Sequence, residues 1–307
     1  MKPIVSRFGI CRTVVVATIG ALMLATTGTA RAQETDWASV EIRTVPVAPG
    51  VYVLMGRGGN IGLSVGADGA FLIDDQFAPL TEKIRAAVGA VTPEPVRFVL
   101  NTHWHGDHTG GNENMGSAGA LIVAHDNVRR RMNPADFRDL VGRSNQAPPR
   151  ALPVVTFSDE INFHWNGEHL HVFHAARAHT DGDAVILFTR ANVVHMGDLF
   201  FNGRYPFIDL ESGGGVQGVI DAADAVLALA RPDTKIIPGH GDLAGPAELR
   251  AYRDMIASVR DQVSRLKSQG MTEDQVVAAS PTQAFDAVWG QNAERFVRAV
   301  YRSLETP

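Results

Sequence analysis

The feature that most constrains this chain is the segment Asn101-Thr-His-Trp-His-Gly-Asp-His-Thr-Gly-Gly111, which places three histidines and one aspartate within six positions. The segment follows the apolar stretch Val96–Leu100, which has the length and composition of a buried strand. Imidazole nitrogens and carboxylate oxygens bind Zn²⁺, but four such groups so close in sequence cannot comfortably reach one tetrahedral ion. The spacing therefore predicts two ions, with His103 and His105 directed at one and Asp107 and His108 at the other.

Three further candidate ligands each follow an apolar segment. They are His179 in Ala178-His-Thr-Asp-Gly-Asp183, Asp198 in His195-Met-Gly-Asp198, and His240 in Ile236-Ile-Pro-Gly-His-Gly241. Each would lie at the end of a predicted strand, a position from which it could reach a shared metal site. Within the histidine segment itself, Gly106 is expected to give the backbone the freedom to turn its neighbours toward different ions.

These seven residues together resemble the ligand set of the metallo-β-lactamase superfamily, and the resemblance spans nearly the whole chain after residue 32. It implies that His103, His105 and His179 hold a first Zn²⁺, that Asp107, His108 and His240 hold a second, and that Asp198 bridges both. A hydroxide between the two ions would attack a carbonyl, with Asp107 as the catalytic residue that orients it. Iron or manganese would also suit these donors.

One position departs from the best-known antibiotic-resistance subclass, in which a cysteine holds the second metal and a lysine three residues later meets the substrate carboxylate. This chain has Asp198 and Phe201 at those positions. The aspartate pattern is similar to the glyoxalase II and lactonase branches, and Asn202–Phe207 resembles exported hydrolases related to quinoprotein relay proteins. The expected substrate-binding residues are Trp104, Phe201 and Arg204, with Arg204 replacing the lysine as an anion clamp.

The hydrophobic pattern predicts two blocks of strands, each followed by helices, and hence two packed sheets with helices outside them. With the resemblance, this gives an α+β fold, a four-layer αβ/βα sandwich with two mixed β-sheets flanked by helices. Residues 33–307 are expected to form one domain. Residues 133–153, rich in proline, are a candidate lid, and Gly56–Asn60 a flexible flap. Strands are expected at 51–54, 60–65, 70–74, 96–100, 168–173, 184–188, 193–196 and 235–238, and helices at 79–88, 216–230, from 246 and around 296–304.

Residues 1–32 have the organisation of a secretory signal peptide, with a basic start, an apolar run from Val14 to Ala25 and Ala30-Arg-Ala32 before a cleavage site. Twelve apolar residues span roughly 18 Å, which is too short for a stable membrane anchor. The expected location is periplasmic or secreted. The only cysteine, Cys11, lies in this segment, so the mature protein would contain no thiol ligand or nucleophile.

Charge excludes another class of function. Of the 28 Lys and Arg residues, four lie in the first 32 positions, so 24 remain against 33 Asp and Glu, a formal net charge of −9. Such a chain offers no general attraction for a phosphate backbone, which disfavours a nucleic-acid partner and leaves a small molecule as the expected substrate. The oligomeric state is left open.

The remaining histidines and several aspartates are weaker candidates for metal ligands. His164, His169, His171 and His174 are expected on the surface or behind the ligands, and His125 and His195 in packing positions. Asp74, Asp75, Asp181 and Asp183 are candidates to orient ligand imidazoles from behind, with an ordinary turn role as the alternative.

The sequence thus predicts a periplasmic dinuclear zinc hydrolase that acts on a β-lactam, lactone, ester or thioester, with β-lactamase-like activity the most favoured named activity. Two alternatives remain open. One is an alkylsulfatase-type hydrolase. The other is a non-catalytic metal-binding relay protein that serves a periplasmic dehydrogenase.

Overall fold

The computed structural model describes residue 1, residues 35–133, 147–290 and 292–304. Residues 37–307 group into one compact unit. The predicted signal peptide and most of the proposed lid at 133–153 lie outside the described residues. Among those described, no helix is both long and apolar enough to cross a membrane.

The first sheet contains seven strands in sequential order. The first four pair antiparallel through short turns, whereas the fourth to seventh run parallel. β3 and β4 are buried at every position, as expected for strands covered on both faces. The strands are β1 (Arg43–Ala48), β2 (Val51–Met55), β3 (Ile61–Ser64), β4 (Ala70–Ile73), β5 (Val96–Leu100), β6 (Leu121–His125) and β7 (Val155–Phe157).

The second sheet contains five strands in the order β12-β11-β10-β9-β8, and only the pair β11 and β12 is parallel. Both sheets are therefore mixed, as predicted. The strands are β8 (Glu160–Trp165), β9 (Glu168–Ala175), β10 (Asp183–Phe188), β11 (Val193–Phe201) and β12 (Lys235–His240).

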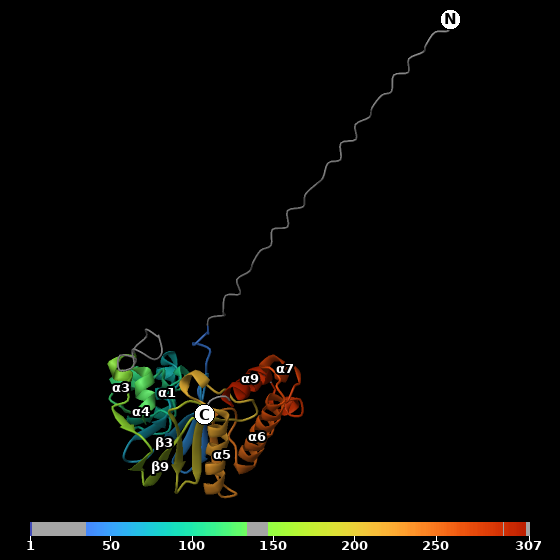
Figure 1. Ribbon diagram of the computed structural model, residues 1–307. Helices are drawn as coiled ribbons and strands as arrows, with labels where there is room; N and C mark the ends of the chain where they lie inside the picture. Colours follow the sequence, from blue (N-terminus) through green and yellow to red (C-terminus); the bar gives the residue numbers. More distant parts are fainter. Residues whose placement is uncertain (2–34, 134–146, 291, 305–307) are drawn as a thin grey trace. The chain divides into compact units, whose positions relative to one another are not determined.

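Helices cover the outer face of each sheet and complete the four predicted layers (Figure 1). One outer layer contains η1 (Ala78–Leu80), α1 (Thr81–Gly89), α3 (Asn112–Ser117), α4 (Asp126–Met132) and η3 (Pro149–Ala151), and α2 (Gly106–Thr109) lies at the end of β5. The other side has η4 (Leu210–Ser212), α5 (Val216–Leu229), α6 (Pro246–Ser268), α7 (Glu273–Ala278), α8 (Asp286–Trp289) and α9 (Ala293–Ser303).

Apolar side chains join these layers. Between the sheets, Phe71 and Leu100 of the first sheet belong to one cluster with Ile186 and Phe188 of the second. A second cluster joins the outer face of the first sheet to α1 and α3, and a third joins the second sheet to α5, α6 and α9. Burial on both faces of each sheet removes a large apolar area from water and holds the strand ends at one edge in fixed positions.

The predicted strands and long helices are confirmed to within five residues at each end, but four strands were not anticipated. These are β1, β6, β7 and β8. The largest boundary difference is β11, which continues through Gly197 and Asp198 to Phe201. Gly197 has φ 51°, and the pairing with β12 shifts register on either side of it. This irregularity lets a continuous strand place Asp198 at the site described next.

Candidate metal centre

The seven candidate ligands meet at the edge where several strands end. Three histidines and Asp107 follow β5, and His179 lies between β9 and β10. Asp198 lies on β11, and His240 ends β12. Their donor atoms form two groups, in each of which all lie within 4.8 Å of one another. The first cluster comprises His103, His105, His179 and Asp198, and the second cluster comprises Asp107, His108 and His240.

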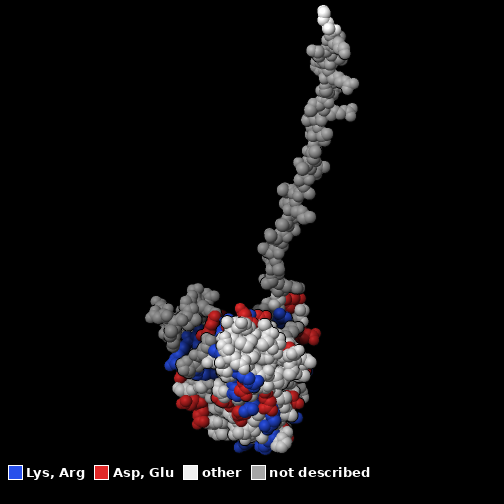
Figure 2. Space-filling model, turned by 45° about the vertical axis from the view of Figure 1, so that its right-hand side comes forward, with Lys and Arg blue, Asp and Glu red and all other residues white. Residues whose placement is uncertain are grey.

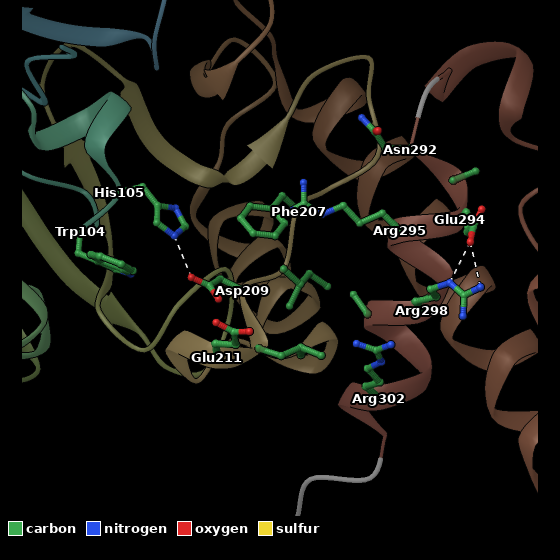
Figure 3. A pocket seen from close by; sticks show the side chains of 14 residues that line it. Trp104, His105, Phe207, Asp209, Glu211, Asn292, Glu294, Arg295, Arg298 and Arg302 are labelled. Atoms are coloured by element: carbon green, nitrogen blue, oxygen red, sulfur yellow. Dashed lines mark hydrogen bonds and ion pairs between the residues drawn. The ribbon is translucent and has the colours of Figure 1, made fainter. Parts of the chain in front are cut away.

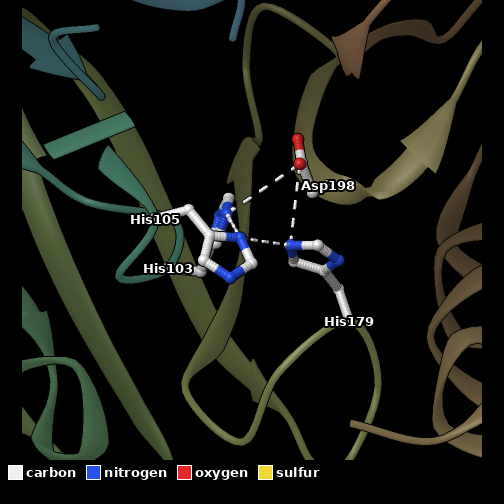
Figure 4. Close-up of side chains that lie close together, drawn as sticks. All are labelled: His103, His105, His179 and Asp198. Atoms are coloured by element: carbon white, nitrogen blue, oxygen red, sulfur yellow. Dashed lines mark hydrogen bonds and ion pairs between the residues drawn. The ribbon is translucent and has the colours of Figure 1, made fainter. Parts of the chain in front are cut away.

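In the first cluster, three ring nitrogens converge on one point (Figure 4). His105 Nδ1 lies 3.1 Å from His103 Nε2 and 2.9 Å from His179 Nε2. The same two Nε2 atoms lie 3.9 and 3.6 Å from Asp198 Oδ2. Three nitrogens and one oxygen around a common centre are a donor set that fits a four-coordinate ion such as Zn²⁺.

The second cluster uses the other oxygen of Asp198. Asp198 Oδ1 lies 3.1 Å from His108 Nε2 and 3.4 Å from His240 Nε2. Asp107 Oδ2 lies 3.2 Å from His240 Nε2 and 3.6 Å from His108 Nε2. The two oxygens of Asp198 thus face different clusters, which is the arrangement that a bridging carboxylate requires.

Two atoms of this centre support the fit of a cation. His108 Nε2 and Asp198 Oδ1 are buried and, although they lie 3.1 Å apart, neither makes a well-aligned hydrogen bond to the other or to another group. Buried polar atoms are normally satisfied, because leaving one without a partner costs about 1–3 kcal/mol. A cation between these two atoms would satisfy both, so the residues present fit a metal ion.

The ring nitrogens of His105, His108 and His179 that face away from the clusters have fixed partners. His108 Nδ1 lies 2.7 Å from Asp74 Oδ2, and His105 Nε2 lies 2.9 Å from Asp209 Oδ2. Such contacts select the ring tautomer and orientation that a ligand needs. His179 Nδ1 lies 2.7 Å from the carbonyl oxygen of Phe207.

Asp74 is the aspartate whose predicted orienting role the structure supports. It has φ 65° and is fully buried. Its carboxylate also accepts hydrogen bonds from the backbone N–H and the hydroxyl of Thr102. The other three aspartates bond elsewhere: Asp75 to Gly111, Asp181 to Arg131 and Asp183 to Thr180. For these three the alternative of an ordinary local role holds, because their carboxylates serve turns and an ion pair rather than ligand imidazoles.

Asp209 was not predicted from the sequence. It is 104 positions from His105 and follows a non-repetitive segment, so no local pattern marks it. Ser212 donates to it through both its backbone N–H and its hydroxyl, which fixes the carboxylate in a short 3₁₀ turn. A residue of this kind can be found only from the folded arrangement of the chain.

The electrostatic environment differs between the clusters. Burial lowers the pKa of His103 well below its ordinary value and lowers the pKa of His179 to about 4. Burial opposes the charged form of His108 and His240 as well, but the nearby carboxylates together outweigh it, Asp198 with Asp74 at His108 and Asp198 with Asp107 at His240. The pKa of His108 is therefore raised well above its usual value, and that of His240 to about 9.

The negative charge of the two clusters comes from Asp198 and Asp107. Burial would raise the pKa of Asp198, but the neighbouring charges of His108 and His240 hold the pKa well below its usual range. Burial would raise the pKa of Asp107 too, but the interactions with His240 and His108 together outweigh it, so this pKa is also lowered. Both carboxylates are thus in the ionised form that binds cations.

Glycines near the clusters show where the backbone approaches the ligands. Gly106 begins the helical turn α2, adopts no left-handed conformation and has open space where a Cβ would lie. The prediction that Gly106 supplies special backbone freedom is therefore wrong. A Cβ on Gly59 would lie 2.1 Å from a carbon of His108, and one on Gly239 would lie 2.1 Å from Asp198 Oδ1.

The predicted flap at Gly56–Asn60 is tied down at its far end. The N–H of Gly59 donates to the carbonyl of Asp107, and the N–H of Asn60 donates to the carbonyl of Gly239. Gln76 and the side chain of Asn60 add further hydrogen bonds. Gly59 and Asn60 therefore form part of the wall behind the second cluster, and only the exposed tip retains the geometry of a flap.

Two cavities flank the centre and contain two of the three predicted substrate-binding residues. A cavity of about 920 Å³ lies beside His105 and is lined by Trp104, and one of about 450 Å³ lies beside His240 and is lined by Arg204. Phe201 is buried instead, with its ring stacked on His240 at a centroid distance of 5.4 Å. Its position favours support of the imidazole over contact with a substrate.

The other six histidines contribute to neither cluster within the described part of the chain. His164, His169 and His171 lie on β8 and β9, where the latter two share Asn162 Oδ1 as a partner. His125 and His174 stack on each other at 3.8 Å. His195 is buried against the carbonyl of Asn60.

Comparison with known proteins extends these observations. The family model of the metallo-β-lactamase superfamily matches residues 54–240. Among solved structures, the stereoselective inverting sec-alkylsulfatase Pisa1 from Pseudomonas sp. aligns with a TM-score of 0.68 at 18% identity, over 85% of this chain and 50% of that chain. This chain therefore spans about half the length of the alkylsulfatase.

Two metallo-β-lactamases also align. The enzyme from Pontibacter korlensis gives a TM-score of 0.59 at 18% identity, over 71% of this chain and 99% of that chain. The DIM-1 metallo-β-lactamase gives 0.59 at 17% identity, over 71% and 98% respectively. At these identities the likeness shows the fold alone, which confirms the predicted architecture.

Proposed function

The chain belongs to the metallo-β-lactamase superfamily, and from this premise we propose that it is a dinuclear zinc hydrolase that acts on the carbonyl of a β-lactam, lactone, ester or thioester. The observation that carries the proposal is the orientation of Asp198, whose two oxygens face separate clusters of histidines. A mononuclear site would not require the second set of donors, Asp107, His108 and His240. Two bound cations would lower the pKa of water and polarise a carbonyl oxygen.

The chain's own residues would contribute position and charge. His103, His105 and His179 would hold the first ion, and Asp107, His108 and His240 the second. Asp74 and Asp209 would keep two of these rings in the required orientation. Because the outward ring nitrogens are fixed by the protein, little reorganisation would be needed when ions bind.

Asp107 is proposed as the catalytic residue. Its side chain is 29% exposed, more than those of the other six candidate ligands. It is therefore the carboxylate best placed to contact water as well as an ion. Its lowered pKa favours the ionised form, which accepts a hydrogen bond and can orient a water molecule.

Arg204 is proposed to bind the polar end of a substrate from the smaller cavity. Arg57 lines the same cavity from the turn between β2 and β3. Both side chains are exposed. Trp104 would contact the substrate from the larger cavity, where its ring lies 5.1 Å from that of His105.

β-Lactam hydrolysis is the proposed named activity, with export to the periplasm and removal of residues 1–32 as further parts of the proposal. On the face shown in Figure 2, acidic and basic side chains are intermixed, and no continuous basic stripe crosses its described part. This distribution supports a small-molecule substrate over a nucleic acid.

Turnover of the chromogenic cephalosporin nitrocefin, measured with the zinc content of the same sample, tests the proposal. We expect two zinc ions per chain and hydrolysis that Asp107→Ala abolishes. Asp107→Asn is the matched control, since it keeps an oxygen donor without the charge and should retain more metal than activity. A protein with two zinc ions that hydrolyses no lactam, lactone, ester or thioester would contradict the proposal and favour a metal-binding relay role.

Export has a separate test. Expression with the native leader should yield a periplasmic protein whose N-terminal sequence begins at Gln33. An unprocessed chain retained in the cytoplasm would contradict this part of the proposal without affecting the hydrolase assignment.

A further inference from the structure

The larger cavity is closed on one side by a helix that follows all seven candidate ligands in sequence. Residues from the β5–α2 loop, from the segment around Phe207 and from α9 line this space (Figure 3). His105 of the first cluster is part of the lining. A molecule bound here would therefore contact the C-terminal helix and lie beside the proposed metal centre at the same time.

Three arginines of α9 line the cavity, at spacings of three and four that place them on one helix face. Two of them are held by carboxylates. Arg298 lies 2.9 Å from Glu273 and 2.7 Å from Asp274, and Arg302 lies 2.8 Å from Glu273. These ion pairs join α9 to α7.

Arg295 is different. Within the described part of the chain it makes no ion pair, and its guanidinium carbon lies 3.8 Å from the ring centroid of Phe207. A guanidinium on an aromatic face keeps its N–H groups free at the edge, where they can bind a planar anion in a bidentate manner. The contact also restricts the side chain, so less conformational entropy is lost when an anion binds.

Phe207 connects this arginine to the first cluster. Its ring lies 5.8 Å from that of His105 at an interplanar angle of 22°, and its carbonyl oxygen is the partner of His179 Nδ1. Arg295 therefore lies one aromatic ring away from a candidate ligand. An anion bound by Arg295 would lie in the same cavity as His105.

The acidic residues of the cavity do not neutralise Arg295. Asp209 accepts hydrogen bonds from Ser212 and lies against His105. Glu294 pairs with Arg298, and Glu211 has a partner of its own. Among the charged residues that line the cavity, Arg295 is the one without an ionic partner in the described structure.

We propose that Arg295 binds a carboxylate of the substrate, a few bonds from the scissile carbonyl, and that the enzyme therefore prefers anionic substrates. This inference rests on the proposed hydrolase function for the reaction, but the anion site itself can be tested without turnover. Arg295 is here a specificity-determining residue, and Phe207 is the surface that positions it.

Calorimetric binding of glutarate and pentanoate to the zinc-loaded protein tests the anion site directly, because the two differ only by the second carboxylate. We expect wild type to bind glutarate about tenfold or more tightly than pentanoate. Arg295→Gln should reduce this ratio to about twofold or less, and Arg295→Lys should restore part of it. Arg250→Gln is the matched control, because it removes the same charge from an exposed position on α6 that lines neither cavity, and it should keep the preference. Equal binding of both ligands by wild type, an unchanged preference in Arg295→Gln, or an equal loss of the preference in Arg250→Gln would overturn the inference.

Hydrolysis of mono-4-nitrophenyl glutarate and 4-nitrophenyl pentanoate extends the test to the reaction. In Arg295→Gln, KM for the glutarate ester should rise about tenfold with kcat nearly unchanged, and KM for the pentanoate ester should stay the same. If neither ester is hydrolysed while the binding preference and its loss in Arg295→Gln persist, the ester part of the hydrolase proposal fails and the anion site stands. Because Arg295 is exposed, thermal unfolding of the variant should match that of wild type.

Discussion

The two clusters share one carboxylate but are built in different ways. In the first, the ring nitrogens of His105 and His179 that face outward meet Asp209 and the carbonyl oxygen of Phe207, both from the loop after β11. In the second, His108 is held by the buried Asp74 at the end of β4, and His240 ends a strand. The first cluster thus depends on a loop that also lines the larger cavity, and the second depends on the sheet core.

The two metal-free clusters also differ in the protonation of their histidines. Lowered pKa values make His103 and His179 neutral at pH 7, ready to bind a cation. Raised pKa values make His108 and His240 cationic until an ion displaces their protons. We infer that the first cluster binds its ion more readily and that the second is the site sensitive to conditions.

The largest expected effect comes from the residue that the clusters share. Asp198→Ala should reduce metal content to one ion or fewer per chain and lower kcat/KM by about 10²–10³-fold or more, since both clusters lose an oxygen. Asp198→Asn is the matched variant and should retain the ion of one cluster better than that of the other. Two tightly bound ions in Asp198→Ala, measured by elemental analysis after dialysis, would show that the clusters are independent of this carboxylate.

Metal affinity should depend on pH in the second cluster. Because an ion must displace protons from imidazoles whose pKa is raised, its affinity should increase up to about tenfold per pH unit for each displaced proton, until pH exceeds about 9. The affinity of the first ion should depend less steeply on pH above pH 7, since the lowered pKa of His103 and the pKa of about 4 of His179 leave no proton to displace from these two rings. Competition with a chromophoric chelator from pH 6 to 9 measures both. Two affinities with equal pH slopes would break the distinction between the clusters.

The partners behind the rings provide a third comparison. Asp74→Asn should lower the affinity for the second ion, and Asp209→Asn should lower the affinity for the first, each by about 10–100-fold. Asp74→Asn should have the greater effect on ion binding, because this buried carboxylate also accepts two hydrogen bonds from Thr102, whereas Asp209 is 15% exposed. Ion-by-ion affinities of the two variants are the measurement. Loss of the same ion in both variants would contradict the separate attachment of the clusters.

The candidate ligands could be predicted from the sequence because each belongs to a local pattern, either the dense histidine segment or a short motif after an apolar strand. Asp74 was predicted in the same way, since it ends such a strand. Asp209 and Arg295 belong to no such pattern, and the Asn202–Phe207 segment did not indicate what Phe207 contacts. Their roles arise when a loop and a distant helix pack beside His105, and that packing depends on side-chain contacts across the whole fold.

The secondary structure shows a related limit. Strongly apolar segments such as Val96–Leu100 were predicted at their observed bounds. β8 was missed because its positions alternate between exposed and half-buried and include a histidine, an asparagine and a glutamate. The course of β11 past Gly197 was missed because a register shift depends on the neighbouring strand, and no residue of the segment specifies it alone.

The smallest effects concern the glycines, and they test how closely the backbone supports the second cluster. A Cβ on Gly59 would meet the ring of His108 at 2.1 Å, and that ring is fully buried and held by Asp74, so it cannot easily move away. Gly59→Ala should therefore lower the free energy of unfolding by about 1–3 kcal/mol and weaken the second ion.

Gly106→Ala is the matched control within the histidine segment itself, because a Cβ there meets nothing within 4 Å and the backbone is helical. Its stability should stay within about 0.5 kcal/mol of wild type, and its metal content should be unchanged. Denaturant unfolding of both metal-free variants, followed by zinc titration, separates packing from metal binding. If Gly59→Ala lowers the affinity for the first ion as much as that for the second, the wall formed by Gly59 and Asn60 supports the centre as a whole. The structural division between the clusters would then not extend to their metal affinities.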